Sequence, residues 1–180
     1  MLRNASLITA LLSITAIATP LQKTAPKAAF TFANVEYFHR YTKGGLHEFT
    51  PKAQTNLQKW TDMFTINGYA TVKTGEALAS TANKVLTTYK ANKGIVLQTE
   101  SVPRTAKKPA EHLIVVLFQR PDFAETAFAR FVMSNRKGVS MVYSHRIYGK
   151  NAHSAMDAWI TKNGGKTTMA VMGIASVPKH

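Results

Sequence analysis

An uninterrupted apolar run, Leu113 to Phe118, constrains the fold more than any other feature of the sequence. Neighbouring side chains on a β-strand point to opposite faces of the sheet, so a strand over His112 to Phe118 would be apolar on both faces. Such a strand is typical of a central position in a sheet that is covered on both sides. The run therefore predicts a layered protein rather than an open sheet or a helical bundle.

Other strands are expected on both sides of this run. Residues 125–133 fit either a helix or a strand, and a strand is favoured because large and small side chains alternate there. The loop Ser134 to Gly138 then predicts a hairpin. The remaining strand candidates are Phe30 to Tyr41, Leu46 to Phe49, Trp60 to Ile66 (followed by a turn at Asn67-Gly68), Ile95 to Val102 and Val139 to Tyr148.

Three helices are expected. The clearest is Gly75 to Lys93, with an apolar stripe, Thr74 as its N-cap and Gly94 in the left-handed position after its end. A short helix should begin at Thr50-Pro51. A C-terminal helix carries Trp159 on its apolar side, and Asn163-Gly164-Gly165 should break or kink it.

These elements predict an α+β fold, in which a mostly antiparallel sheet is covered by a long central helix and a C-terminal helix. The order of elements from Gly75 to Ile160, with "AEHLIVVLF", the hairpin ending in "VYSHRIYG" and the helix with Trp159, resembles the Mog1/PsbP-like superfamily of α/β/α sandwiches. The resemblance lies in element order and includes no signature motif. It implies a binding or scaffold protein, because members of that superfamily share no active site.

The first 18 residues have the pattern of a secretory signal: Arg3, an uncharged apolar run from Ala5 to Ile17, and Ala16-Ile17-Ala18 before the expected cleavage site. The run is shorter than the roughly 20 apolar residues of a membrane-spanning helix. We therefore expect a signal peptide over residues 1–18, a flexible tether over 19–29 and a single domain over 30–180. The processed protein would be periplasmic or extracellular, without a transmembrane anchor.

The chain is strongly basic, with a formal net charge of +14, and loss of Arg3 would leave +13. Its Lys and Arg residues are spread along the chain, and the densest cluster, Arg104 to Lys108, has no aromatic residue beside it. Nucleic-acid binders usually combine a basic groove with stacking rings or carry a basic helix. We therefore expect weak attraction to anionic surfaces and no specific binding of nucleic acid.

No catalytic, cofactor or metal motif is complete. The absence of cysteine excludes disulfides, thiolate ligands and a cysteine nucleophile. His47-Glu48 lacks the second histidine of the zinc-protease motif and has Pro51 in its place. Gly164-Gly165-Lys166-Thr167 lacks the first glycine of a phosphate-binding loop. The sequence thus predicts no catalytic residues, no cofactor and no metal site.

One strand end combines rings, a cation and hydroxyls. Alternation places Tyr143 and His145 on one face, and Arg146 and Tyr148 on the other, with His112 expected nearby. These five residues are the candidate ligand site, and the alternative is that they satisfy buried carboxylates and carbonyls. The functional expectation is an exported, non-enzymatic binding or accessory domain with an unknown ligand or protein partner. The alternative function is a hydrolase of cell-wall or other anionic material, with a site assembled across strands.

Overall fold

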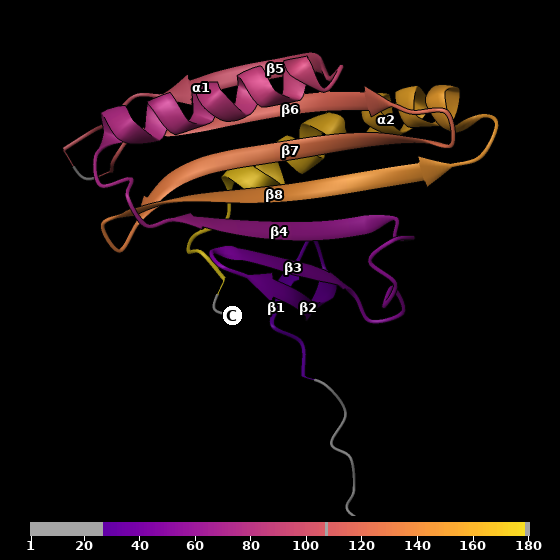
Figure 1. Cartoon of the computed structure of the whole chain (residues 1–180), viewed down its shortest axis with the longest axis horizontal. Coiled ribbons are helices and arrows are strands. Elements are labelled where there is room, and N and C mark those ends of the chain that lie inside the picture. The colour runs from indigo at the N-terminus through magenta and orange to yellow at the C-terminus, as the bar shows by residue number, and fades with distance from the viewer. Residues whose placement is uncertain (1–26, 107, 179–180) are drawn as a thin grey trace, which may run out of the picture.

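The computed structural model describes residues 27–106 and 108–178 (Figure 1). The expected signal peptide and most of the expected tether lie outside the described residues. Eight antiparallel strands form one sheet in the order β1-β2-β3-β4-β8-β7-β6-β5, and two helices pack on it. The strands are β1 (Phe30–Phe32), β2 (Val35–Lys43), β3 (Leu46–Pro51), β4 (Asp62–Tyr69), β5 (Ile95–Val102), β6 (Glu111–Gln119), β7 (Phe123–Ser134) and β8 (Lys137–Tyr148), and the helices are α1 (Gly75–Ala91) and α2 (Ala152–Met172).

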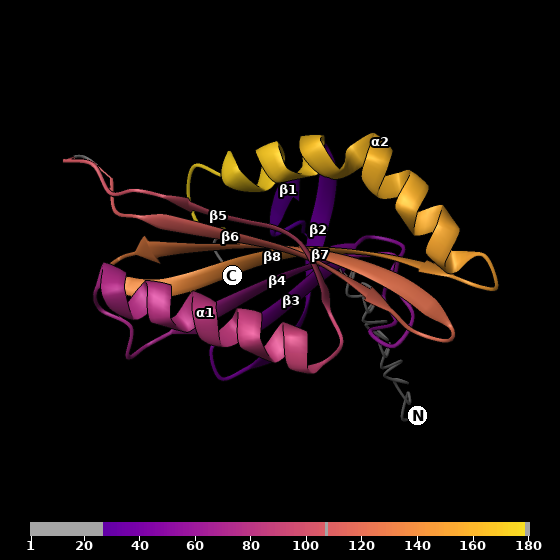
Figure 2. The same cartoon turned by 90° about the horizontal axis from the view of Figure 1, so that it is seen from above.

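The two helices lie on opposite faces of the sheet, which confirms the α+β class with an antiparallel sheet (Figure 2). Residues Leu113 to Leu117 of β6 are all buried, and they alternate between the core under α2 and the core under α1. The prediction of cover on both faces is therefore correct. The predicted central position is wrong, because β6 is second from the edge of the sheet and owes its burial to the two helices.

The core beneath α2 is aromatic. Figure 2 shows β1 and β2 turned up toward α2, so that side of the sheet curls around the helix. Phe32 of β1 reaches Tyr143 of β8 across the curl, with ring centroids 5.2 Å apart. The other large buried rings of this cluster are Tyr37, Phe49, Phe64 and Phe128. The curl thus leaves an aromatic concavity between the β1–β2 hairpin and α2.

Helix α1 begins as predicted, because the Thr74 side chain accepts a hydrogen bond from the backbone N–H of Ala77. Its end differs from the prediction. Lys93, and not Gly94, adopts the left-handed conformation, with φ of 62°. Gly94 is required for space instead: a Cβ there would lie 2.6 Å from Val116 and 2.8 Å from Phe118.

Two local predictions in the first half of the chain are wrong. Thr50-Pro51 ends β3 rather than beginning a helix. The buried Thr50 hydroxyl accepts a hydrogen bond of 2.9 Å from the Arg40 guanidinium on β2. Asn67-Gly68 lies inside β4, where it pairs with β8. In both places strand pairing outweighs the local preference for a helix start or a turn.

In the second half of the chain, residues 125–133 form a strand as favoured, within β7. The β7–β8 hairpin turns at Asn135 and Arg136, whose φ values of 48° and 59° suit a tight turn. Helix α2 continues through the predicted break at residues 163–165 and bends along its length (Figure 2). Across residues 27–106 and 108–178, no helix is both long and apolar enough to cross a membrane.

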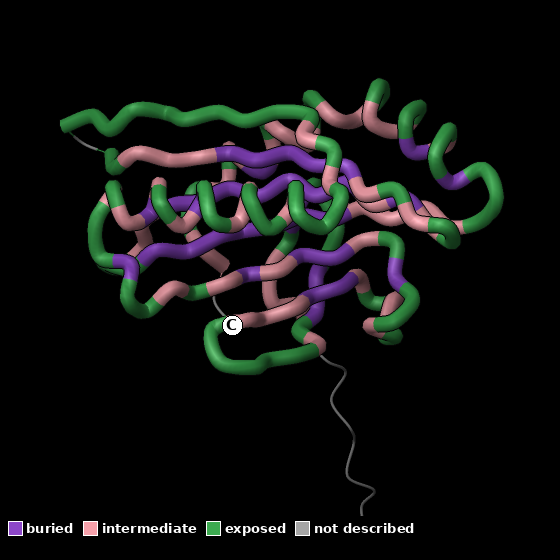
Figure 3. The backbone as a smooth tube through the Cα atoms, turned by 45° about the horizontal axis from the view of Figure 1, so that its top comes forward, coloured by how far each residue is buried: buried purple, intermediate pink, exposed green. Residues whose placement is uncertain are grey.

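Burial is concentrated in the middle of the sheet, where β7 and β8 are buried along most of their length (Figure 3). The outer strand β5 is exposed at every residue except Val96. The aromatic concavity and the exposed strand therefore lie toward opposite edges of the sheet.

Candidate functional site

His145 and Tyr143 both face α2 and share one carboxylate. Asp62, the first residue of β4, lies opposite His145 in the β4–β8 register. Its Oδ1 is 3.0 Å from Nδ1 of His145 and accepts a hydrogen bond of 2.8 Å from the Tyr143 hydroxyl. Its Oδ2 accepts bonds from Thr61 at 2.8 Å and from Gln54 at 3.2 Å. The Asp62 carboxylate is therefore fully hydrogen-bonded.

Burial alone would raise the pKa of Asp62, but hydrogen bonds from His145, Tyr143 and Thr61, together with the charge of His145, lower it to about 2. The same carboxylate and burial raise the pKa of Tyr143 well above its usual value, with burial the larger cause. Near neutral pH, Asp62 is an anion and Tyr143 is a neutral hydroxyl that donates to it.

The imidazole of His145 is held from a second side by α2. Its ring stacks on Trp159, with centroids 4.2 Å apart and planes 12° from parallel. Trp159 in turn meets Phe128 edge-on at 6.3 Å. Within residues 27–106 and 108–178, the His145 ring hydrogen-bonds through Nδ1, and its Nε2 has no hydrogen-bond partner. The histidine is thus oriented by Asp62 and Trp159 and keeps one free ring nitrogen.

A cavity of about 320 Å³ opens between the β1–β2 hairpin and α2, above this cluster. Four aromatic rings contribute to its walls. The lining residues are Phe32, Ala33, Val35, Tyr37, Asp62, Tyr143, Trp159, Asn163, Lys166, Thr167 and Ala170. His145 is not among them, although its ring stacks on Trp159, which is.

Tyr37 is the unusual member of the lining. The residue is 2% exposed, yet its hydroxyl has no hydrogen-bond partner in the part of the chain that the structure describes. The one enclosed, unpaired side-chain nitrogen or oxygen in that part is Nε2 of His112, so the Tyr37 hydroxyl is open to the cavity. Burial, and then the charge of Asp62, raise the pKa of Tyr37. The hydroxyl is therefore a protonated donor that faces an aromatic cavity.

Polar groups from α2 line the cavity opposite the rings. Lys166 is exposed, and Thr167 is half-buried beside it. The Asn163 amide nitrogen donates to the Trp159 carbonyl at 3.0 Å, which leaves its side-chain oxygen available. The cavity therefore combines an apolar body with a few placed polar groups, the usual composition of a small-molecule site.

Arg146 and Tyr148 lie on the other face, as strand alternation predicted, and are occupied there. The Arg146 guanidinium donates to Glu125 at 3.1 and 2.6 Å and lies 4.0 Å from the Trp60 ring centroid and 4.2 Å from that of Phe123. The Tyr148 hydroxyl donates to the Trp60 carbonyl at 3.0 Å. These contacts favour a structural role for both residues.

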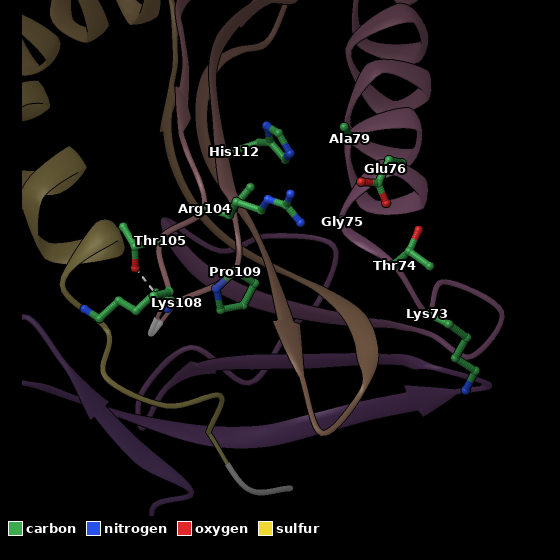
Figure 4. Close-up of a pocket in the computed structure, with 12 residues that line it drawn as sticks. Lys73, Thr74, Gly75, Glu76, Ala79, Arg104, Thr105, Lys108, Pro109 and His112 are labelled. Carbon is green, nitrogen blue, oxygen red and sulfur yellow. Dashed lines mark hydrogen bonds between the residues drawn. The ribbon is translucent and has the colours of Figure 1, made fainter.

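His112 does not join the other candidates. It pairs with Phe131 on β7, whereas Tyr148 pairs with Phe123 at the other end of that strand, roughly 26 Å away. The expected gathering is wrong. His112 lies on the α1 face of the sheet, opposite to Tyr143 and His145, and toward the other end of β7 from Arg146 and Tyr148. His112 instead lines a second cavity, of about 680 Å³, where it and Arg104 face the start of α1 (Figure 4).

In this second cavity, burial lowers the pKa of His112, and its Nδ1 is 2.9 Å from the Ser101 hydroxyl. The start of α1 is already capped by Thr74, and Glu76 brings a negative charge. No group of three or more His, Asp or Glu side chains that could hold a metal occurs in the described ranges.

Sequence reasoning missed Asp62 and Tyr37, which contribute most to the site. Asp62 reads as an ordinary acid at the start of a strand, and Tyr37 as one ring in an aromatic-rich segment. Only the register that places β4 beside β8, and the curl that brings β2 to α2, reveals their roles. Trp159 was expected as a core residue, and it also stacks on His145 and lines the cavity.

No family model matches the chain, and no curated protein matches it. Among solved structures, the chain is similar to human STARD10, with 8% sequence identity and a TM-score of 0.31, over 77% of this chain and 74% of that one. A similarity at this level assigns no function. The resemblance to the Mog1/PsbP-like superfamily stays a prediction.

Proposed function

We propose that this protein is a non-enzymatic binding domain for a compact, mostly apolar ligand that carries an oxygen acceptor. The ligand occupies the cavity between the β1–β2 hairpin and α2, with its apolar body against the rings. Its oxygen accepts a hydrogen bond from the Tyr37 hydroxyl. The observation that carries the proposal is the Tyr37 hydroxyl, which opens into an aromatic cavity and has no hydrogen-bond partner among the described residues.

The chemistry of the cavity suits such a ligand. A hydrogen bond from Tyr37 to a ligand oxygen would replace one to water in the open cavity, and such an exchange contributes about 0.5–1.5 kcal/mol. The volume of about 320 Å³ lies at the lower end of the range for small-molecule sites. Asp62 is saturated by four protein donors, so it does not compete for the ligand and keeps Tyr143 in place.

A hydrolase is the second candidate, favoured by one observation. Asp62 orients His145 through Nδ1 and leaves Nε2 free, which is how a carboxylate holds a general base. However, His145 does not line the cavity, and Ser144 faces the opposite side of the sheet, toward α1. The described lining residues include no serine, so the binding function is the better supported of the two.

The proposed place of action is outside the cytoplasm, in the periplasm or the extracellular medium. The basis is the signal-like pattern of residues 1–18. The site itself is compatible with export, because it contains no thiol and its polar contacts need no metal.

Binding can be tested with a cavity-filling variant. The probe is 1-anilinonaphthalene-8-sulfonate, which has apolar rings and an oxygen acceptor, followed by fluorescence at pH 7. Ala170→Phe places a ring in the cavity and should weaken probe binding at least tenfold. Met169→Phe is the matched control, because Met169 lies on the same helix and is 68% exposed. Equal probe binding by both variants, with unchanged folding by circular dichroism, would exclude this cavity as the site.

The hydrolase alternative has its own test. Wild type and His145→Gln are incubated with a panel of acyl esters and with cell-wall polymers, and product release is measured. Turnover that depends on His145 would replace the binding function with the enzymatic one. Absence of turnover in both proteins is the result that the binding function predicts.

A further inference from the structure

The two edges of the sheet are built differently. At one edge β1 has three residues, and at the other β5 has eight. Strand β5 pairs with β6 alone, so its outer N–H and C=O groups have no strand beside them among the described residues. Proteins usually protect a long edge with lysine, proline, bulges or a covering element, because an open edge accepts further strands.

Strand β5 has few of these protections. It contains no lysine, arginine or proline, and Ile95, Leu97 and Val102 are 49%, 42% and 38% exposed. A bulge between Val96 and Gln98 interrupts the ladder and leaves Gln98–Val102 as the regular stretch. Figures 1 and 3 show β5 as the exposed outer strand of the sheet.

Charge differs between the middle of this edge and its ends. The only charged residue within β5 is Glu100. Lys93 lies two residues before the strand and Arg104 two residues after it, and both are exposed. The Arg104 guanidinium faces the start of α1, where its charge also attracts the exposed Glu76, so a partner's acidic end would compete with that carboxylate. Lys93 and Arg104 therefore lie at the two ends of a mostly uncharged strand, at least roughly 30 Å apart.

We propose that the outer edge of β5 binds an extended segment of a partner protein, apolar in its middle and acidic at both ends. The segment adds a ninth strand by backbone hydrogen bonds, as in other cases of strand addition. Its acidic ends pair with Lys93 and Arg104, and its middle avoids Glu100. This edge lies across the sheet from the cavity, so the inference does not depend on the ligand.

A second copy of this chain fits the edge poorly. Antiparallel pairing of two β5 strands would bring Lys93 of one copy toward Arg104 of the other. Each copy also has a net charge of +14, and like charges across an interface are unfavourable. An acidic partner meets the opposite condition at both ends.

The test uses a fluorescent ten-residue peptide, Glu-Glu-Thr-Val-Thr-Val-Thr-Val-Glu-Glu, and anisotropy with the full chain. Two further peptides carry N-methyl groups on alternate residues, in one register or the other. An extended peptide faces its partner strand with one edge alone, so one methylated peptide should bind like the parent and the other at least tenfold more weakly. Equal binding by both methylated peptides, or no binding by the parent, overturns the proposal.

Charge swaps give the matched control. Lys93→Glu/Arg104→Glu should weaken binding of the parent peptide at least tenfold, whereas Lys150→Glu/Lys162→Glu, with the same change in net charge at exposed sites elsewhere, should stay within twofold. Equal loss in both variants would mean that attraction is generic and would refute the proposal. Light scattering gives the oligomeric state of wild type and of the Lys93→Glu/Arg104→Glu variant. If wild type is a dimer and the variant is a monomer, the edge binds a second copy of this chain, and the proposal is refuted.

Discussion

Replacement of Arg146 by methionine should destabilise the protein by about 3–5 kcal/mol, the usual cost when one partner of a buried ion pair is removed. The Arg146 and Glu125 side chains are each 17% exposed, and one guanidinium donates twice to the same carboxylate oxygen. Methionine keeps an unbranched apolar stem but lacks the guanidinium. The variant therefore removes the charge, the hydrogen bonds and the cation–ring contacts together.

The magnitude has two sources. Glu125 is left partly buried without its cation, which is the larger cost. The guanidinium also lies 4.0 Å from the Trp60 ring centroid and 4.2 Å from that of Phe123, and each such contact contributes about 0.5–2 kcal/mol. Methionine recovers part of the ring contact through its sulfur and methyl group.

The assay is urea denaturation followed by circular dichroism, for wild type, Arg146→Met, Glu125→Leu and the double variant. The double variant should lie within about 2 kcal/mol of wild type, because an apolar pair leaves no uncompensated charge. Arg120→Met is the control. Arg120 donates one bond to the Asn92 carbonyl and lies 5.3 Å from the Phe118 ring centroid, but its loss leaves no buried carboxylate without a partner, so it should cost about 1–2 kcal/mol. A cost below 1 kcal/mol for Arg146→Met, or no recovery in the double variant, would refute a structural role.

Three other predictions follow from single features. The pKa of Asp62 is depressed to about 2, so its ionised form stabilises the folded state by about 2 kcal/mol. In acid-denaturation curves this stabilisation should be complete above about pH 4 and lost as the pH falls from about 4 to 2. Asp62→Asn should remove this pH dependence. Gly94→Ala should destabilise the protein by about 1–3 kcal/mol, because the new Cβ would lie 2.6 Å from Val116. Gly165→Ala, in open space within α2, should stabilise it by about 0.5–1 kcal/mol. Denaturation midpoints that shift in the same direction for both variants would contradict this. The exported protein should begin at Thr19, as intact-mass measurement can check.

The fold class was predictable because its signals are periodic and local. The both-face apolar run at Leu113 to Phe118, the stripe of α1 and the β7–β8 hairpin all follow from side-chain spacing. The wrong predictions, a helix at Thr50-Pro51 and a turn at Asn67-Gly68, followed dipeptide preferences. Cross-strand pairing overrides those preferences, and sequence spacing does not reveal the pairs.

The candidate site was predictable only in part, for the same reason. Alternation along β8 correctly separated Tyr143 and His145 from Arg146 and Tyr148. The partners of these residues come from distant segments, with Asp62 more than 80 residues before His145. The curl that brings Tyr37 to α2 depends on packing of the whole sheet, so no local pattern indicates the cavity.

The central claim is that Tyr37 donates a hydrogen bond to a ligand oxygen, and competitive displacement by matched ligand pairs tests it most directly. Each pair, such as acetophenone with ethylbenzene or 1-acetylnaphthalene with 1-ethylnaphthalene, differs by one carbonyl oxygen. The ketone should displace the fluorescent probe from wild type about three- to tenfold better than its hydrocarbon, and Tyr37→Phe should abolish that advantage without a loss of stability. An advantage that persists in Tyr37→Phe, or no displacement by any member of the pairs, would contradict the claim.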